Sequence, residues 1–120
     1  MTDKVLNPED LNVFVKAHKL TLELNKVTKH FPSHEKWELV SQIRRAAASI
    51  GANLMEGSHR NNSGEYRQFV GIANGSAGEL KYHLLLGRDL GYIDAAQYDE
   101  LRKECDDISK MLRGLAKSLS

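Results

Sequence analysis

Two pairs of glutamate and histidine in this sequence have spacings that can ligate a metal on a helix. Glu56 and His59 form a Glu-x-x-His motif, and Glu79 and His83 stand four residues apart. A dinuclear iron or manganese centre in a helical bundle needs two Glu-x-x-His motifs and two further inward-facing glutamates. The sequence has one such motif, and it straddles an expected helix end. We therefore predict no metal centre and no cofactor.

Nucleophilic side chains are present, but their spacing does not suggest activation. Cys105 is the single cysteine and falls on an apolar helical repeat, which is typical of a small buried hydrophobe rather than a reactive thiol. His30 and His34 flank a Phe-Pro-Ser turn and are interpreted as solvated loop residues. The glycine-rich stretch at 71–78 follows no expected strand and is not a phosphate loop. The sequence predicts a protein that is not an enzyme.

A polar stripe runs along the helix expected over about residues 34–57. On a helical wheel with Ile43 facing the core, the stripe holds Gln42, Arg45, Ser49, Asn53 and Glu56. The planar guanidinium of Arg45 suits a carboxylate, a group of carbonyls or a phosphate. Three interpretations stay open: a structural network that pairs Arg45 with Glu56 or Glu79, a ligand or nucleic-acid contact, and a solvated charge. We favour the network, as a latch that orders helices or subunits.

Basic residues are expected to gather at one end of the molecule. Antiparallel helices would bring together the end of the second helix, the start of the third and the end of the fourth. Dipole complementarity explains the bases at the end of the fourth helix, but not Arg60 and Arg67, which lie at or before a helix start. Repeated in a ring of subunits, these charges would form a collar able to bind RNA or DNA. This basic pole consists of His59, Arg60, Arg67, Lys110, Arg113 and Lys117.

Apolar residues recur at alternating spacings of three and four along most of the chain, which indicates helices packed in a bundle. The clearest repeat is Tyr98, Leu101, Cys105, Ile108, Leu112, Leu115 and Leu119. Helices are expected over about 8–30, 34–57, 64–90 and 95–118, in a single domain at 1–120. Short connections predict an all-α, antiparallel up-down-up-down four-helix bundle. The expected caps are Asn7, Ser33, Ser63 and Asp94 at helix starts and Gly57 and Gly91 at helix ends.

The third expected helix has a second face that a monomer does not need. Gly71, Gly75, Gly78 and Tyr82 point almost directly away from the core side marked by Ala73. Each interior glycine costs about 0.5–1 kcal/mol relative to alanine. Three of them on one outer face favour close packing of another copy of the chain. The alternative is that the helix merely tolerates glycine.

Composition sets the broad class. The 120 residues carry a formal net charge of +1, so the whole chain is not a polycation. No run approaches the roughly 18 apolar residues of a membrane span, and the start lacks the apolar core of a signal peptide. With one cysteine, no intrachain disulfide forms. We expect a cytoplasmic protein without a membrane partner.

Several stretches together resemble a known bacterial family. The resemblance covers about residues 11–119 and rests on Gln42-Ile-Arg-Arg-Ala-Ala-Ala-Ser-Ile, Asn53, Glu56-Gly57, Arg60, Glu65-Tyr-Arg-Gln-Phe69, Ile72-Ala-Asn-Gly-Ser76, Glu79-Leu80 and Leu90-Gly-Tyr-Ile93. The chain is similar to the four-helix-bundle proteins encoded in intervening sequences of 23S rRNA genes, also labelled S23 ribosomal proteins. That family has no settled activity.

The resemblance implies a homopentameric ring. It also implies kinship with the accessory variability determinant of diversity-generating retroelements, a basic pentameric barrel that binds a reverse transcriptase and nucleic acid. This chain departs from that relative because it is nearly neutral. We expect a non-enzymatic homo-oligomeric scaffold that binds RNA, DNA or a nucleic-acid enzyme through His59, Arg60, Arg67, Arg113 and Lys117. The expected subunit interface contains Arg45, Ser49, Glu56, Gly71, Gly75, Gly78 and Tyr82. The alternative is a protein–protein interaction module without nucleic-acid affinity.

Overall fold

Four long helices account for most of residues 8–119, the part of the chain that the computed structural model describes. They are α1 (Asn12–Val27), α2 (Leu39–Ser58), α3 (Ser63–Asp89) and α4 (Ala95–Ser118). Short 3-10 turns occupy Pro8–Asp10, Thr28–His30 and Ser33–Glu35, and these described residues include no strand. The all-α, four-helix part of the prediction is confirmed. Within this range no helix has the length and apolar character needed to cross a bilayer.

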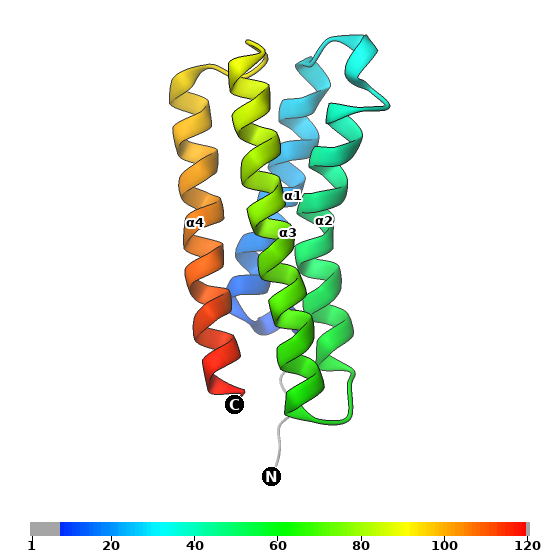
Figure 1. The fold of residues 1–120 in the computed structure, drawn as a ribbon, viewed down its shortest axis with the longest axis vertical. Coiled ribbons are helices and arrows are strands. Elements are labelled where there is room, and N and C mark those ends of the chain that lie inside the picture. Colours follow the sequence, from blue (N-terminus) through cyan, green and yellow to red (C-terminus); the bar gives the residue numbers. More distant parts are fainter. Residues whose placement is uncertain (1–7, 120) are drawn as a thin grey trace.

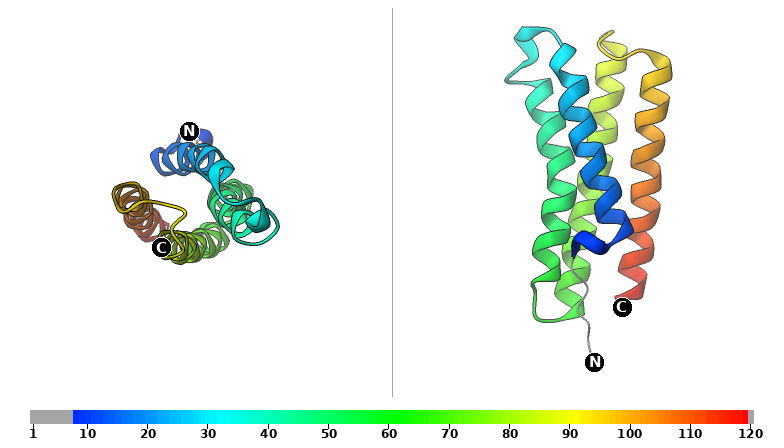
Figure 2. Two further views of the ribbon diagram at one scale, coloured as in Figure 1. Left: turned by 90° about the horizontal axis from the view of Figure 1, so that it is seen from above. Right: turned by 180° about the vertical axis from the view of Figure 1, so that it is seen from behind.

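The helices lie side by side in a rod of 51 × 24 × 20 Å. Seen end-on, they surround a common centre, and α1 contacts α2 and α4 while α3 contacts the same two helices (Figure 2). The α1–α2 and α3–α4 connections lie at one end of the rod, and the short α2–α3 connection lies at the other (Figure 1). The end of α2, the start of α3 and the end of α4 therefore meet at one pole, which is the arrangement that a basic pole requires.

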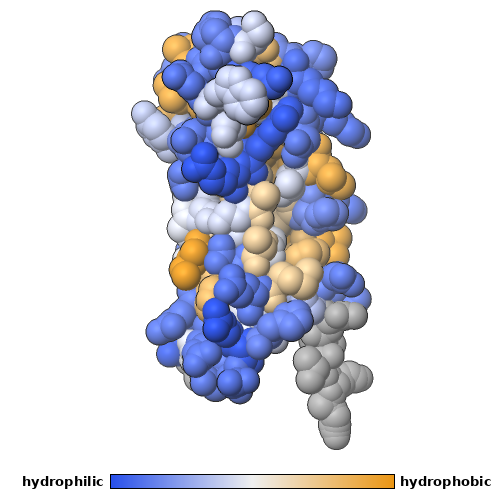
Figure 3. Space-filling model, turned by 90° about the vertical axis from the view of Figure 1, so that its right-hand side faces the viewer, coloured by the Kyte–Doolittle hydropathy of each residue, from blue (hydrophilic) through white to orange (hydrophobic). Residues whose placement is uncertain are grey.

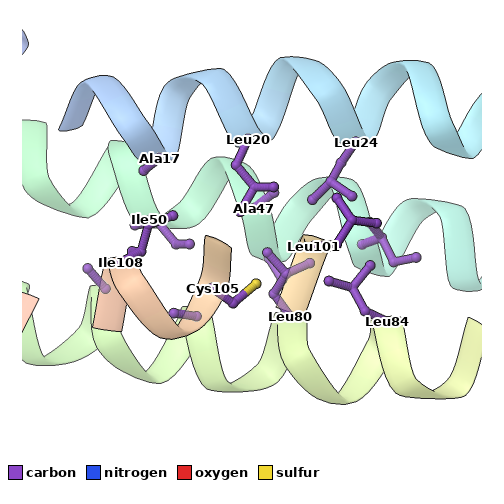
Figure 4. Packing of buried hydrophobic residues seen from close by; sticks show 14 of the residues in the cluster. Ala17, Leu20, Leu24, Ala47, Ile50, Leu80, Leu84, Leu101, Cys105 and Ile108 are labelled. Atoms are coloured by element: carbon purple, nitrogen blue, oxygen red, sulfur yellow. The ribbon is translucent and has the colours of Figure 1, made fainter. Parts of the chain in front are cut away.

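The core is a set of aliphatic side chains pointing inward from all four helices (Figure 4). The apolar repeat expected for α4 is buried from Tyr98 to Leu112, and Ile50 of α2 and Leu80 of α3 are each 0% exposed. In α1 the sequence spacing predicts a buried repeat of Leu11, Phe14, Ala17, Leu20 or Thr21, Leu24, Val27 and Phe31. The start of this repeat is shifted in the structure, since Val13 is buried while Phe14 is only half-buried. Val13 is in phase with Ala17, Leu20 and Leu24, and Phe14 lies at the edge of this seam.

The α4 helix is also tied to its neighbours by ion pairs at the surface. Lys16 Nζ lies 2.9 Å from Glu104, and Lys81 Nζ lies 2.7 Å from Asp106. The pKa of Asp106 is lowered, first by the hydrogen bond from Lys81. Such partly exposed pairs add little stability each. They link α4 to α1 and to α3 and neutralise Lys16 and Lys81.

Side-chain caps mark the starts of α3 and α4. Asp94 Oδ1 accepts a hydrogen bond from the Gln97 amide at 2.8 Å, so this predicted cap is confirmed. The cap of α3 is Asn62 instead of Ser63, because the Asn62 side chain accepts from the Glu65 amide at 2.9 Å. Ser63 is the first helical residue. The capping role expected of Asn7 lies outside the described residues.

The second helix starts later than expected. Ser33–Glu35 form a separate 3-10 turn, and Glu38 has a non-helical backbone with φ −117° and ψ −96°. The α-helix begins at Leu39, whose amide donates to the Glu35 carboxylate at 3.3 Å. Lys36 stands three residues after Ser33, where a capping box needs Glu or Gln, so Ser33 cannot start the helix with that motif. The Glu35 carboxylate is the acceptor that binds the first amide of α2.

The two glycines expected to end helices play different roles. Gly91 has φ +85°, and hydrogen bonds from Gly91 to Arg88 and from Tyr92 to Gly87 close α3 in a Schellman motif. Gly57 is buried inside α2 and does not end it. A Cβ atom at Gly57 would lie 2.7 Å from Phe69 Cβ and 2.9 Å from the Tyr66 ring. Gly57 therefore permits the close approach of α2 and α3.

Candidate self-association face and basic pole

The two glutamate–histidine pairs are occupied by local contacts. Glu56 Oε2 binds Arg60 at 2.9 Å, and His59 Nδ1 lies 2.9 Å from the Met55 carbonyl. His83 Nε2 lies 3.2 Å from Glu79, so Nε2 carries the proton in the neutral ring. Its Nδ1 is then a buried acceptor without a partner among the described residues. No group of three or more potential metal ligands forms in this part of the chain.

A serine and a histidine do meet at the end of α2, a contact that sequence reasoning missed. Ser58 Oγ is 3.3 Å from His59 Nδ1, but it donates to the Met55 carbonyl at 2.7 Å. If His59 Nδ1–H also donates to that carbonyl, it cannot accept a proton from Ser58. The negative end of the helix dipole further disfavours an alkoxide here. The pair therefore stabilises a helix end and does not form a nucleophile and its base.

Cys105 lies in the core, 0% exposed, as its repeat predicts. Burial raises the pKa of its thiol to about 12. Because the thiolate is the reactive form, native protein at pH 8 is expected to resist modification by iodoacetamide, whereas urea-unfolded protein reacts readily. Mass spectrometry of the two samples checks this expectation. Equal labelling of both would contradict the buried position.

The polar stripe of α2 forms a network with α3. Ser49 Oγ lies 2.8 Å from Ser76 Oγ, and Asn53 Nδ2 donates to the carbonyl and hydroxyl oxygens of Ser49 at 2.8 and 2.9 Å. These hydrogen bonds join two helices of one subunit. The network interpretation thus holds for Ser49 and Asn53, as a latch between helices.

Arg45 is not part of this latch, so its predicted pairing with Glu56 or Glu79 is wrong. Both carboxylates bind residues four positions further along the chain, Arg60 just after the end of α2 and His83 within α3. Such i,i+4 partners need little ordering and are always within reach. Arg45 is exposed and forms no hydrogen bond or ion pair with any described residue.

The structurally engaged arginine is Arg44, which sequence reasoning missed. Its Nε donates to Thr28 Oγ1 at 2.9 Å, and its Nη2 donates to the Asn25 carbonyl at 3.1 Å. Thr28 is itself 3% exposed. The position of Arg44 in the sequence could have indicated this role. Arg44 lies one turn from both Val40 and Ala47, at the edge of the apolar seam of α2.

The outer face of α3 is open, as its glycines predict. A Cβ atom added at Gly71, Gly75 or Gly78 would meet nothing within 4 Å. Nearby on the same helix, Ile72 and Tyr82 are 52% and 57% exposed. We call these five residues the glycine face. Nothing within the subunit explains its three glycines, in contrast with Gly57, which packing inside the subunit requires.

A second apolar surface lies between α1 and α2. It is a groove of about 360 Å³. Figure 3 views the molecule from the side of α2 and shows apolar atoms gathered at mid-height between hydrophilic ends. We call this surface the α1–α2 groove. It is lined by Phe14, His18, Thr21, Ala48, Gly51, Ala52 and Met55.

The basic pole forms at the end of the rod where α2, α3 and α4 meet (Figure 1). Arg60 is already engaged there, since it pairs with Glu56 and its guanidinium stacks 4.6 Å from the Phe69 ring centre. Arg67 and Arg113 are exposed and have no ionic or hydrogen-bonding partner in residues 8–119. Lys117 has an interaction of its own. Lys110 is likewise exposed and has no such partner in these residues, so Arg67, Lys110 and Arg113 are the most available cations of the pole.

The pole also contains acids that the sequence interpretation left out. Helix α1 begins toward this end of the rod, preceded by Glu9 and Asp10 in the Pro8–Asp10 turn (Figure 1). Glu65 lies in the first turn of α3. Acids at helix starts complement the dipole. The pole is therefore a mixed surface with an excess of bases and is less basic than its arginines alone suggest.

Comparison with known proteins places this architecture in a family. No curated protein matches the sequence. A solved structure that matches is that of a protein with unknown function from the S23 ribosomal protein family of Bacteroides thetaiotaomicron, with a TM-score of 0.81, 26% sequence identity, and coverage of 88% of this chain and 98% of the other. Residues 9–114 match the 23S rRNA-intervening sequence protein family. The chain belongs to the family of 23S rRNA-intervening sequence proteins.

Proposed function

We propose that this protein is a non-enzymatic scaffold that assembles from copies of itself and presents its basic pole to RNA, DNA or a nucleic-acid enzyme such as a reverse transcriptase. The subunit number that the family resemblance implies is five. The unpaired, buried Cys105 is compatible with a reducing compartment such as the cytoplasm. The reasons for self-association and for nucleic-acid contact are separate and are tested separately.

The observation that carries self-association is the glycine face. Gly71, Gly75 and Gly78 lie in the interior of a 27-residue helix, where each costs about 0.5–1 kcal/mol relative to alanine. An added Cβ would meet nothing in the subunit at any of the three. The absence of side chains at these three positions would allow the backbone of a second copy to pack closely against α3. The exposed Ile72 and Tyr82 would supply apolar area at the same contact.

A ring needs two different faces, because only head-to-tail contacts close into rings with an odd number of subunits. The α1–α2 groove supplies a second face of suitable chemistry. It is apolar and lined by small residues including Ala48, Gly51 and Ala52. We propose that the glycine face of one copy packs into the groove of the next. Arg45 of α2, which is exposed and has no partner among the described residues, would then hydrogen-bond across the contact.

The alternative function is a protein-interaction scaffold without nucleic-acid affinity. Its support is electrostatic, since the net charge of the chain is only +1. Arg60 is neutralised by Glu56, and Glu9 and Asp10 lie toward the basic pole. Weak positive potential gives weak, salt-sensitive binding. The two functions share the assembly and differ only in what the pole contacts.

Replacing Gly75 with leucine is expected to prevent self-association while leaving the helix content intact. The leucine side chain would fill the space into which a neighbouring backbone packs, but it would meet nothing within its own subunit. Light scattering measures the mass in solution, and far-UV circular dichroism measures helicity. We expect the variant to be a monomer.

Gly114→Leu is the matched control. Gly114 is also an exposed helical glycine with no atom within 4 Å of an added Cβ, but it lies on α4. We expect this variant to assemble as the wild type does. A wild-type protein that is monomeric at micromolar concentration, or an assembly that tolerates Gly75→Leu, would disprove the proposed contact.

A further inference from the structure

A basic pocket lies at the end of the rod opposite the basic pole. It has a volume of about 260 Å³ and lies where the Thr28–His30 and Ser33–Glu35 turns meet the start of α2. Three cationic side chains line it, those of Lys29, Lys36 and Arg44. No carboxylate is among the lining residues, which also include Thr28, Phe31, Pro32, Ser33 and Val40.

Arg44 gives this pocket a fixed cation. Its guanidinium is half-buried and held by two hydrogen bonds, to Thr28 Oγ1 at 2.9 Å and to the Asn25 carbonyl at 3.1 Å. Both acceptors are neutral, and the remaining N–H groups of Arg44 have no partner among the described residues. A partly buried charge without a counter-ion is unfavourable unless an anion compensates it. The anchoring also preorganises the planar donor set for such an anion.

The surrounding charges do not neutralise this site. Lys29 and Lys36 form no ion pair within residues 8–119, although Lys36 Nζ lies 5.1 Å from the Trp37 ring centre. Glu35 is the neighbouring acid, but its carboxylate accepts from the Tyr92 hydroxyl at 2.8 Å and from the Leu39 amide. Glu35 lines a different pocket, with Trp37 and His83. Three cationic residues therefore line one cavity that no carboxylate lines.

We propose that this pocket binds a phosphate group. Arg44 would bind two phosphate oxygens through its free N–H groups, Lys29 and Lys36 would add charge, and the Ser33 hydroxyl would donate a hydrogen bond. The same chemistry fits a free phosphate, a small phosphate ester or a phosphate of an RNA strand. A carboxylate would bind less well, because a phosphate dianion has more charge and more acceptor oxygens. This site is independent of the basic pole and of the glycine face.

Inorganic phosphate is the first probe. We expect a titration followed by ¹H–¹⁵N correlation NMR, at constant ionic strength set by chloride, to shift the amide signals of Lys29, Ser33 and Arg44 saturably. Arg44→Gln is expected to weaken this binding by about tenfold or more, because charge-assisted hydrogen bonds contribute more than neutral ones. Lys29→Gln keeps the anchored arginine intact and is expected to weaken binding by several-fold. This second variant keeps the test valid if Arg44→Gln is unstable.

The matched control is Lys19→Gln, since Lys19 is an exposed lysine of α1 that does not line the pocket. We expect it to bind phosphate as the wild type does. Short RNA strands with a 5′-phosphate or a 5′-hydroxyl distinguish the sources. A preference for the 5′-phosphate indicates a terminal phosphate, equal shifts at these residues indicate the strand backbone, and shifts with inorganic phosphate alone indicate a small ligand. Absence of saturable shifts at Lys29, Ser33 and Arg44 with every probe, or equal losses in Lys19→Gln and Lys29→Gln, would overturn the proposal.

Discussion

Replacing Leu80 with alanine is expected to lower the free energy of unfolding by about 2–5 kcal/mol. Leu80 is 0% exposed and lies in the centre of the bundle, where its side chain points toward Cys105 and Leu101 of α4 (Figure 4). The substitution removes buried apolar contacts and leaves a cavity that four packed helices cannot close. Urea denaturation followed by far-UV circular dichroism measures the loss.

Leu22→Ala is the control for this change, because Leu22 is 52% exposed on α1. We expect its effect to stay within about 0.5 kcal/mol. Both variants are best compared in the Gly75→Leu background at one protein concentration, since assembly contributes to apparent stability. Equal losses for Leu80→Ala and Leu22→Ala would mean that the core is not centred where the four helical seams meet.

Charge reversal at the basic pole is expected to have the largest effect on function. In the assembled protein, Arg67→Glu combined with Arg113→Glu should lower RNA affinity by about 100-fold or more at low salt, since every subunit loses two phosphate contacts and gains two repulsive charges. Wild-type binding should also fall steeply with salt. For six or more phosphate contacts, the loss is about 10³-fold or more between about 50 and 200 mM salt. Fluorescence anisotropy with labelled RNA measures both effects.

The control with the same change in net charge is Lys19→Glu combined with Lys26→Glu, on the exposed side of α1. We expect it to retain most of the affinity. If the two double variants bind equally, the attraction is a general effect of net charge and not a property of the pole. If the wild type does not bind RNA or DNA at about 50 mM salt, the nucleic-acid function fails and the interaction scaffold remains.

Local physics explains which parts of the fold were predictable. The apolar repeat with Tyr98, Leu101 and Cys105 commits α4 to a bundle, because only one helical face can bury all of them. Asp94 and Gly91 act within three or four residues of their own positions, as a cap and as the positive-φ residue of a helix end. Such features need no knowledge of the rest of the chain.

The polar part of the candidate site was harder to predict. Arg44 and Arg45 are adjacent in sequence but about 100° apart around the helix. One turns toward Thr28 on the neighbouring connection, while the other stays in solvent. On a helical wheel, several basic residues lie on the same side as Glu56 and Glu79. That these carboxylates pair with Arg60 and His83 depends on rotamers and on distances in three dimensions. A helical wheel gives directions but does not give partners.

The sequence by itself determined the four helices, the buried side of each except at the start of α1, the inert position of Cys105 and the open glycines of α3. These follow from periodicity and from backbone preferences that act over a few residues. Only the tertiary structure decided that Gly57 is needed for close packing, that Arg44 is the anchored arginine, and that Lys29, Lys36 and Arg44 converge on one pocket. Each of these depends on distances between helices separated in sequence, and those distances are set by how the whole core packs.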